Sequence, residues 1–597
     1  LVCTSANEIS RNVQKLHSEK LGYLTSADFS KLGKDEFNAF RDLLNDGDRK
    51  LVPFHPRPHQ SVALDKCVSH FKNHKNKRGK IIHPCGSGKS LTGYWISQKL
   101  QSKTTLLAVP SLALVRQTLS TWTREAVAND IDMDWIAVCS DEDVKSSDDP
   151  LMQKVDLGIE VNTDPQVVAD FLCKKRVGSK VVVTTYQSGA VVSEGLKKSG
   201  KTFDLGIFDE AHKTVGQKDK KFAHLLYEDN ARVVKRVFMT ATERQFKGNS
   251  DEYLSMDDPE VYGTMIDELS FKAALEQKEP ILSDYKVVTM LVSKSEIKKI
   301  IKDNNFVKSD GSDWTFEGDA STFAALISLR KLIDKHNIKH TVSFHNSIKR
   351  SKDFQKLNFE ISKTNNFGKL SSFHVSGKDS TGARASELER FVETEPSLIT
   401  NARCLNEGVD VPAIDAVLFA DAKQSKIDIV QAAGRALRKF DGKEYGYIII
   451  PVIANDDVLN TSDDIFNQII NVISALGMND SRIIEEYKLI VNGISIPNPI
   501  IEINAPKIAN INFKELMSNI DIEIWNRLSF GWGKGFKRLE EYVDKYHNAF
   551  VPNHFTNDDG FRLGSWVQNR RHWFKKGKLS QDHIQQLESI DGWEWNV

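Results

Sequence analysis

Short, continuously apolar runs recur along most of this chain, and longer polar stretches of helical character separate them. Each run is four to six residues long and rich in Val, Ile and Leu; the runs lie at 80–83, 105–109, 180–184, 205–208, 341–344, 397–400, 416–419 and 447–452. Strands that are apolar on both faces are typical of parallel sheets covered by helices on both sides. The pattern therefore predicts an α/β fold built on parallel sheets.

The series of apolar runs breaks near 280–285, which indicates two successive α/β domains. Beyond Pro451 the chain becomes helical in character, and a proline-containing stretch at 494–506 is typical of a linker. The final segment is distinct, because it holds six of the ten tryptophans. The expected parts are an N-terminal segment at 1–50, α/β domains at 51–284 and 285–455, a helical linker at 456–519 and a small, mostly helical domain at 520–597.

Composition narrows the class of protein. The chain of 597 residues has room for roughly three to four domains. Its 81 Lys and Arg balance 81 Asp and Glu, so net charge gives no sign of a polyanionic partner, and any nucleic-acid surface must be local. The six cysteines form no CxxC pair, which argues against zinc or disulfides and favours the cytoplasm. No apolar run approaches the roughly 18 residues of a membrane span.

A glycine-rich loop follows the first apolar run. Residues 83–90 read His-Pro-Cys-Gly-Ser-Gly-Lys-Ser and precede a helical stretch. Backbone N–H groups in such a loop surround phosphate oxygens, Lys89 can reach the β- and γ-phosphates, and Ser90 can ligate Mg²⁺. His83 departs from the usual P-loop pattern, which has Gly or Ala there. The sequence predicts an ATP site that includes Gly86, Ser87, Gly88, Lys89 and Ser90.

Two acids end the apolar run at 205–208. Asp209 can hold the Mg²⁺ shell, and Glu210 can polarise the attacking water as a general base. Paired acids at a strand end are common on protein surfaces. Their position downstream of a P-loop favours the catalytic interpretation.

Residues 209–212, Asp-Glu-Ala-His, resemble the DEAH-box form of motif II in superfamily 2 helicases. Stretches similar to the other motifs follow in the family's order, at 57–60, 109–117 (Ia), 184–187 (Ib), 239–242 (III), 344–347 (IV), 400–410 (V) and 431–438 (VI). The resemblance implies two RecA-like P-loop domains in tandem that hydrolyse ATP with Mg²⁺ at a shared cleft and hold nucleic acid.

The spacing of the arginines in motif VI is that of a helix. Gln431, Gly434, Arg435 and Arg438 are separated by helical intervals and share one face. From the second domain, two guanidinium groups can neutralise charge on the γ-phosphate as arginine fingers. The resemblance also implies an adenine contact by Gln60, coupling of nucleotide state to strand grip by His212, Thr240 and Thr242, and nucleotide contacts by Gly408 and Asp410.

Two regions are candidates for gripping nucleic acid. The resemblance implies phosphate contacts along both motor domains by Arg116, Gln117, Thr184, Thr185, Asn346 and Thr400. The segment 562–578 holds six bases and no acid, interleaved with aromatics, and is similar to part of a helicase-associated domain. Its expected contacts are Arg570, Arg571, Lys575 and Lys576. Alternatively these bases form a solvated face; most of the tryptophans are expected to build the domain's core.

The motifs predict a nucleic-acid-dependent ATPase acting as a helicase or translocase. DNA is favoured over RNA, because motifs V and VI are more similar to those of restriction and repair motors. An RNA helicase, or a scaffold that binds ATP without turnover, are the alternatives. The chain begins with Leu, and residues 2–10 resemble the tail of an Mrr-like nuclease domain. This favours the motor of a restriction, defence or mobile-element system with a nuclease upstream.

Overall fold

The computed structural model describes the chain in segments. These are 51–139, 161–175, 178–217, 221–244, 253–293, 319–363, 367–377, 381–402, 411–421, 425–454, 464–477, 498–504, 533–552, 563–575 and 581–595, with a few residues between them and near the N-terminus. The chain divides into two compact units. The first comprises 1–456 and 499–508; the second comprises 457–498 and 509–597.

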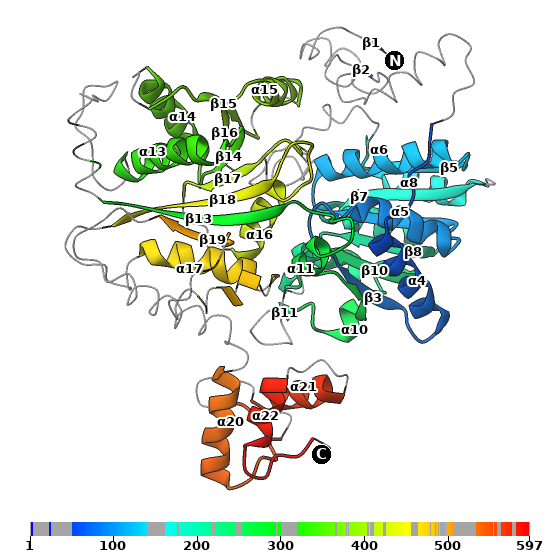
Figure 1. Cartoon of the computed structure of the whole chain (residues 1–597). Coiled ribbons are helices and arrows are strands. Elements are labelled where there is room, and N and C mark those ends of the chain that lie inside the picture. The colour runs from blue at the N-terminus through cyan, green and yellow to red at the C-terminus, as the bar shows by residue number, and fades with distance from the viewer. Residues whose placement is uncertain are drawn as a thin grey trace. The chain divides into compact units, whose positions relative to one another are not determined.

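The first unit begins with an eight-stranded parallel sheet in the order β12-β3-β10-β8-β4-β7-β5-β6 (Figure 1). Alternate strand residues enter two apolar clusters, one with helices α4, α5 and α6 and one with α8 and α9, so helices cover both faces. The elements are α4 (Pro58–Lys72), β3 (Arg78–Ile82), α5 (Lys89–Lys99), β4 (Thr104–Val109), α6 (Leu112–Ala128), β5 (Met133–Val138), β6 (Val161–Asn162), α8 (Pro165–Cys173), β7 (Ser179–Thr185), α9 (Gly189–Ser199), β8 (Phe203–Asp209), β10 (Val233–Thr240) and β12 (Thr264–Glu268).

A second parallel sheet follows, with seven strands in the order β15-β16-β14-β17-β18-β13-β19. Helices α13 and α14 pack on one face through a large apolar cluster, and α16 lies on the other (Figure 1). The elements are β13 (Asp284–Ser293), α13 (Asp319–His336), β14 (His340–Phe344), α14 (Ile348–Ser362), β15 (Ser371–Val375), α15 (Thr381–Glu393), β16 (Ser397–Asn401), β17 (Ala416–Phe419), α16 (Lys426–Ala436), β18 (Tyr445–Ala454) and β19 (Ile501–Asn504). The predicted tandem of parallel-sheet α/β domains is confirmed.

Smaller elements complete the first unit. β9 (Gly216–Gln217) pairs antiparallel with β11 (Tyr253–Leu254), and β1 (Val2–Cys3) pairs parallel with β2 (Tyr23–Leu24). Two short helices, α10 (Pro259–Tyr262) and α11 (Phe271–Leu275), flank β12.

The stretch at 494–506 differs from the expected linker, because it contributes a strand. β19 pairs in parallel with β13, and Val287 lies opposite Ile501. Glu502 of β19 forms ion pairs with Lys286 of β13 at 2.9 Å and with Lys335 of α13 at 3.0 Å, which stabilise the position of the strand. The proline and asparagine content of this stretch concealed a four-residue Ile-Glu-Ile-Asn alternation, which has the period of a strand.

The second unit is helical in its described part. It contains α17 (Asp464–Gly477), α20 (Gly533–Tyr546), α21 (Leu563–Lys575) and α22 (Gln581–Glu588). The last three helices enclose an apolar cluster that includes Trp566, and the partly buried Trp593 and Trp595 pack against it. These tryptophans serve the core, as expected for a small domain. Trp525, Trp532 and the side chain of Trp573 lie outside the described residues.

Candidate active site

The phosphate-binding loop joins β3 to α5, and two of its glycines have left-handed backbones. Gly86 has φ +84° and Gly88 has φ +81°. A Cβ atom at Gly88 would lie 2.6 Å from Gln60 Nε2, so Gln60 would have to move, and the left-handed backbone would strain any larger residue there. Gln60 Nε2 donates to the carbonyl of Gly88 at 3.2 Å and to Thr92 Oγ1 at 3.3 Å. Gln60 thus fastens α4 to the loop, and its adenine contact stays a prediction.

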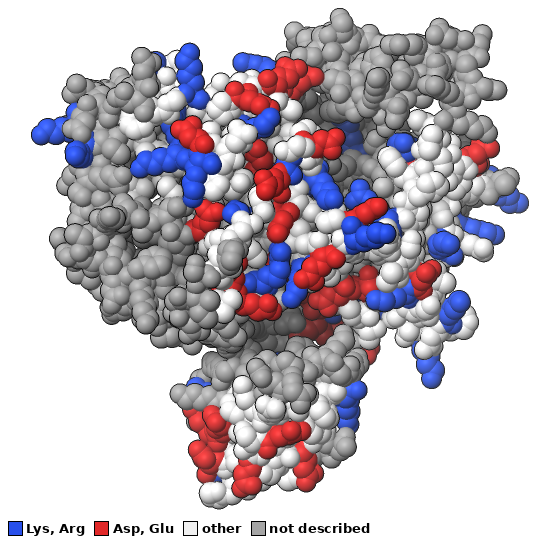
Figure 2. Space-filling model, in the orientation of Figure 1, with Lys and Arg blue, Asp and Glu red and all other residues white. Residues whose placement is uncertain are grey.

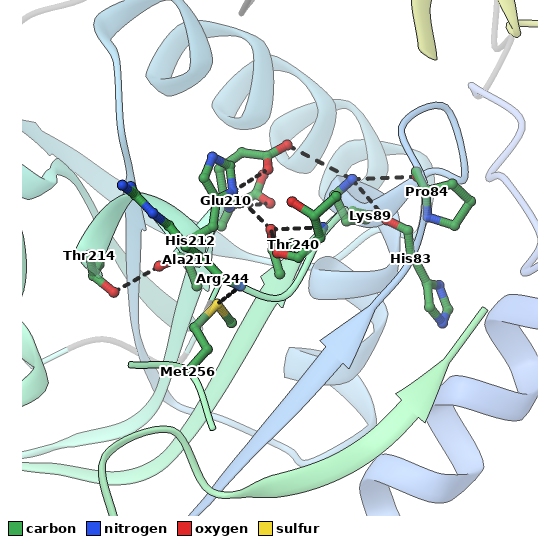
Figure 3. Close-up of polar contacts among 12 residues, drawn as sticks. His83, Pro84, Lys89, Glu210, Ala211, His212, Thr214, Thr240, Arg244 and Met256 are labelled. Carbon is green, nitrogen blue, oxygen red and sulfur yellow. Dashed lines mark hydrogen bonds and ion pairs between the residues drawn. The ribbon is translucent and has the colours of Figure 1, made fainter. Parts of the chain in front are cut away.

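Lys89 opens α5 and points toward Glu210 (Figure 3). Its Nζ donates to the carbonyl of His83 at 3.3 Å and lies 3.9 Å from Glu210 Oε1. Burial opposes the ammonium form, but Glu210 raises the pKa of Lys89 above its usual value. Burial would likewise raise the pKa of Glu210, yet Lys89 and the hydrogen bond to His212 lower it to about 2. The two groups therefore form an ionised, mostly buried pair.

Glu210 has a left-handed backbone, with φ +48° and ψ +46°. A non-glycine residue in this region is uncommon and strained, and such strain gathers at functional sites. Its N–H donates to Asp209 Oδ1 at 2.9 Å, and the Tyr186 hydroxyl donates to the carbonyl of Asp209 at 2.7 Å. The buried Tyr186 was not predicted as part of the site. It holds the strand end that presents both acids.

His212 connects the acidic strand end to β10. Its Nδ1 lies 3.4 Å from Glu210 Oε2 and 2.9 Å from Thr240 Oγ1. The Thr240 hydroxyl also lies 3.1 Å from the carbonyl of Thr242. The three residues expected to couple nucleotide state to strand grip are thus contiguous, and their coupling role stays a prediction.

The donor set suits a magnesium-bound triphosphate. The hydroxyls of Ser87 and Ser90 are buried and have no hydrogen-bond partner among the described residues. Asp209 is close enough to Lys89 to raise its pKa, so a second carboxylate borders the loop. Hydroxyl and carboxylate oxygens are the ligands that Mg²⁺ prefers. Ser90 and Asp209 would therefore hold the ion.

Motif VI approaches the same loop from the second sheet. A Cβ atom at Gly434 of α16 would lie 2.9 Å from Cys85 Cβ, and one at Gly86 would lie 3.5 Å from Arg438 Cγ. Burial raises the pKa of the Cys85 thiol, whereas Lys89, Arg438 and Arg435 act in the opposite direction. Both arginines thus lie within electrostatic reach of the phosphate loop.

The other predicted nucleotide ligands are only partly described. Gln431, on the same helix, is buried, and its Oε1 has no hydrogen-bond partner among the described residues. Gly408 and Asp410 of motif V lie outside the described residues.

A network of polar side chains from α4 and β12 contacts the phosphate-binding loop. His83 Nε2 lies 2.8 Å from Asp267 Oδ2, and Lys66 Nζ lies 2.6 Å from Asp267 Oδ1. Burial would raise the pKa of Asp267, but His83 and Lys66 lower it overall. His59 Nε2 lies 2.9 Å from the carbonyl of Ser87. The sequence shows that His83 departs from the P-loop pattern, but the residues around it give no sign of its partner Asp267 on β12.

Three of the expected phosphate contacts are buried in the motor domains. Thr184 Oγ1 donates to the carbonyl of Val138 at 2.9 Å, and Thr185 Oγ1 lies 2.9 Å from Ser188 Oγ. Thr400 Oγ1 lies 3.0 Å from His374 Nδ1. These hydroxyls therefore bond within their own domains in this structure.

The remaining expected contacts on the motor are more accessible. Gln117 and Asn346 are exposed, and Arg116 is half-buried. On the face shown in Figure 2, basic and acidic side chains of the first unit are interspersed, and acidic ones are prominent on the second. The even charge balance of the chain thus extends to the face of the first unit that Figure 2 shows.

Two of the four bases predicted in the C-terminal domain pack against its own aromatics. Arg571 is buried, donates from Nε to the carbonyl of Glu594 at 2.8 Å and lies 4.8 Å from the Trp593 ring. Arg570 lies 5.2 Å from the Trp566 ring, and burial lowers its pKa to about 10. Lys575 is exposed, and Lys576 lies outside the described residues.

Three family models match separate parts of the chain. Residues 53–245 match the res subunit of type III restriction enzymes, 324–440 match the helicase conserved C-terminal domain, and 529–596 match the helicase associated domain. A probable helicase of African swine fever virus is 27% identical over 438 residues, which are 71% of this chain and 44% of the relative. The DNA 3'-5' translocase XPB2 of Sulfurisphaera tokodaii is 24% identical over 396 residues, which are 62% of this chain and 76% of the relative.

Solved structures share the fold. The Type ISP restriction-modification enzyme LlaBIII bound to DNA aligns with all of this chain and 44% of its own, with a TM-score of 0.70 and 22% identity. A nuclease-deletion mutant of the Type ISP enzyme LlaGI, in complex with a DNA substrate mimic, aligns with 90% of this chain and 40% of its own, with a TM-score of 0.53 and 22% identity. The chain thus spans less than half the length of the viral relative and of both enzymes.

The fold is a tandem of two parallel-sheet α/β domains, and the three matched family models relate this chain to helicases. The chain carries the motor domains of superfamily 2 helicases, followed by a helicase-associated domain. This family uses ATP. In the described parts of the chain, no helix combines the length and apolar character of a membrane span.

Proposed function

We propose that this chain hydrolyses ATP between the phosphate loop and motif VI and uses the energy to move along DNA. The observation that carries the proposal is the convergence of three elements on one loop. Lys89 begins α5, Glu210 follows β8, and Arg438 follows α16 with its Cγ 3.5 Å from a Cβ position at Gly86. A site divided between two domains can couple hydrolysis to their relative movement.

Each residue has a distinct part in the proposed hydrolysis. Lys89 holds the terminal phosphates, and Ser90 and Asp209 would hold Mg²⁺, which when bound would supply positive charge to the phosphates. Arg435 and Arg438 stabilise charge that develops on the γ-phosphate. Glu210 orients the attacking water and accepts its proton.

The Lys89–Glu210 pair implies that phosphate binding precedes the activation of Glu210 as a base. With a pKa of about 2, Glu210 is a weak base while Lys89 faces it. An arriving γ-phosphate competes for the Lys89 ammonium, which lowers the positive field at Glu210 and raises its pKa. Glu210 therefore becomes an effective base only once the phosphate is bound.

DNA is the proposed track, and a restriction, defence or mobile-element system is the proposed setting. A DNA translocase and two DNA-bound restriction-modification enzymes are among the similar proteins, which supports DNA over RNA. The match of 53–245 to the res subunit of type III restriction enzymes points the same way. We also propose a cytoplasmic location and a nuclease upstream of the motor, as a domain or a subunit.

The test is ATP turnover without nucleic acid and with single-stranded DNA, duplex DNA or RNA. We expect DNA to stimulate turnover well beyond RNA. Translocation is then measured as ATP-dependent displacement of a triplex-forming strand from duplex DNA. Stimulation by RNA alone would overturn the DNA assignment, and absence of turnover under all four conditions would overturn the motor.

A further inference from the structure

Arg438 follows the C-terminus of α16, so the helix does not hold its carbonyl. α16 ends at Ala436, and Leu437 is its C-cap. The last carbonyls of a helix lack intrahelical donors and need partners elsewhere. The carbonyl of Arg438 accepts one hydrogen bond from Ser283 Oγ at 3.3 Å. A stronger donor to the same oxygen is the ammonium group of Lys443, at 2.8 Å.

A tight turn presents Lys443 to this carbonyl. The N–H of Lys443 donates to the carbonyl of Phe440 at 3.1 Å, which closes a four-residue turn. Gly442, the third residue of the turn, has φ +79°, the left-handed backbone that a type II turn requires at that place. The turn directs the lysine back toward the arginine five residues earlier.

Lys443 also bonds the segment that follows motif V. Its Nζ donates to the carbonyl of Ile414 at 2.7 Å, between residue 410 and β17. One ammonium group therefore joins this segment to the last residue of motif VI. Charge-assisted hydrogen bonds of this kind are roughly twice as strong as neutral ones.

We propose that Lys443 is a positioning residue for ATP hydrolysis, which holds the backbone of Arg438 so that its guanidinium meets the γ-phosphate. Lys443 acts through Arg438 and touches no substrate itself. The proposal rests on the arginine-finger role in the proposed function. Small displacements of a catalytic group cost large factors in rate, up to about a hundredfold for 1 Å.

The charge state of Lys443 gives this role a pH dependence. Burial lowers the pKa of Lys443 to about 8, while Asp415 raises it and Arg438 lowers it further. Asp415 and Arg438 are the charged groups that act on this ammonium. As pH rises through about 8, the ammonium loses its charge and its bonds to both carbonyls weaken. The positioning should therefore fail on the alkaline side.

The decisive experiment combines Lys443→Met and Arg438→Ala, singly and together, in the full chain with duplex DNA. Lys443→Met keeps the aliphatic stem and should lower kcat about ten- to a hundredfold, with KM for ATP changed less than about threefold. In the Arg438→Ala background, Lys443→Met should cost no more than about twofold further, since the two act as a unit. Multiplicative losses in the double variant would overturn the proposal.

Two further variants sharpen the test. Lys439→Met removes an exposed lysine of the same turn region and should leave kcat unchanged. Lys443→Arg keeps a charge that does not titrate near neutrality, so the alkaline fall in kcat near pH 8 should disappear. An alkaline fall retained in Lys443→Arg, or an equal loss in Lys439→Met, would also contradict the proposal.

The outcomes separate this proposal from the wider function. Lys443→Met with wild-type kcat in an active enzyme removes only the positioning role. A wild-type chain without ATP turnover removes the proposed function and this role together. If Lys443→Met does not fold, the pH profile of Lys443→Arg decides the question, because that variant keeps a charge that does not titrate near neutrality. An alkaline fall in kcat that is retained in Lys443→Arg would then count against the proposal.

Discussion

Lys89 and Glu210 face each other with 3.9 Å between Nζ and Oε1, and their side chains are only 9% and 14% exposed. In this arrangement each charge favours the ionised form of the other. Removing the lysine and removing the glutamate should have different consequences.

Glu210→Gln should still bind ATP but turn over poorly. Loss of a general base typically costs a factor of about 10² to 10⁴ in rate. ATP affinity, measured with a fluorescent ATP analogue, should be at or above that of the wild type, because Lys89 remains and no longer has a carboxylate competing for it. The matched control is Glu194→Gln, an exposed acid on α9 paired with Lys198. Near-normal turnover in Glu210→Gln would remove the catalytic assignment.

Lys89→Ala should lose nucleotide affinity itself. The change removes the cation that binds the β- and γ-phosphates and leaves Glu210 buried without its partner. A binding titration that shows wild-type ATP affinity would contradict the phosphate role.

Arg438→Ala should reduce kcat by about 10³-fold or more, as loss of an arginine finger does. The apparent Tm should change little. A steady-state assay paired with a thermal melt separates the two effects, and an unfolded or fully active variant would contradict the role.

Asp267→Asn should destabilise the first α/β domain at neutral pH. Losing a buried charge-assisted bond to His83 costs about 1–3 kcal/mol. The folded-state pKa of Asp267 is lowered, so its stabilisation is present above the ordinary carboxyl pKa and is lost as pH falls through the lower folded value. The difference in Tm from wild type should therefore shrink toward acid pH. Asp229→Asn, at an exposed acid, is the control and should show no such difference at either pH.

We expect Arg571 to stabilise the C-terminal domain and Lys575 to contact nucleic acid. Arg571→Ala should loosen the domain, seen as faster limited proteolysis of the C-terminal helices, because it removes the bond to the carbonyl of Glu594 and the contact with Trp593. Lys575→Ala should leave the fold intact and flatten the slope of log affinity against log salt by about 0.7 to 0.9. If instead Arg571→Ala flattened the salt slope and Lys575→Ala loosened the domain, Arg571 would be the nucleic-acid contact and Lys575 the structural residue.

Much of the fold could be predicted because most of the central strands contain consecutive apolar residues. All eight predicted runs overlap strands of the two sheets. β10 was missed because it contains Lys235 and Arg236. Arg236 is buried there and pairs with Glu228 at 2.7 Å, a compensation that no local pattern reveals.

The candidate site likewise contains residues that the sequence could predict and residues that it could not. Lys89 and Glu210 have local signals, a glycine-rich loop and acids at a strand end, and the structure places them together. The bond between His83 and Asp267 joins residues 184 positions apart, so the sequence offered no sign of it. Thr184 has the residue type of a phosphate ligand, yet it lies within the sheet, and its hydroxyl satisfies a neighbouring strand.

The strand β19 has a practical consequence for dissecting this protein. The chain leaves the second sheet at β18, returns at residues 501–504 to pair with β13, and departs again. Residues 457–498 are thus an insertion within a domain. A motor fragment ended at residue 456 would lack β19, and β13 would become an uncovered, largely apolar edge prone to aggregation. A fragment that ends beyond residue 508 keeps β19 and therefore the complete sheet, so it is the fragment to purify.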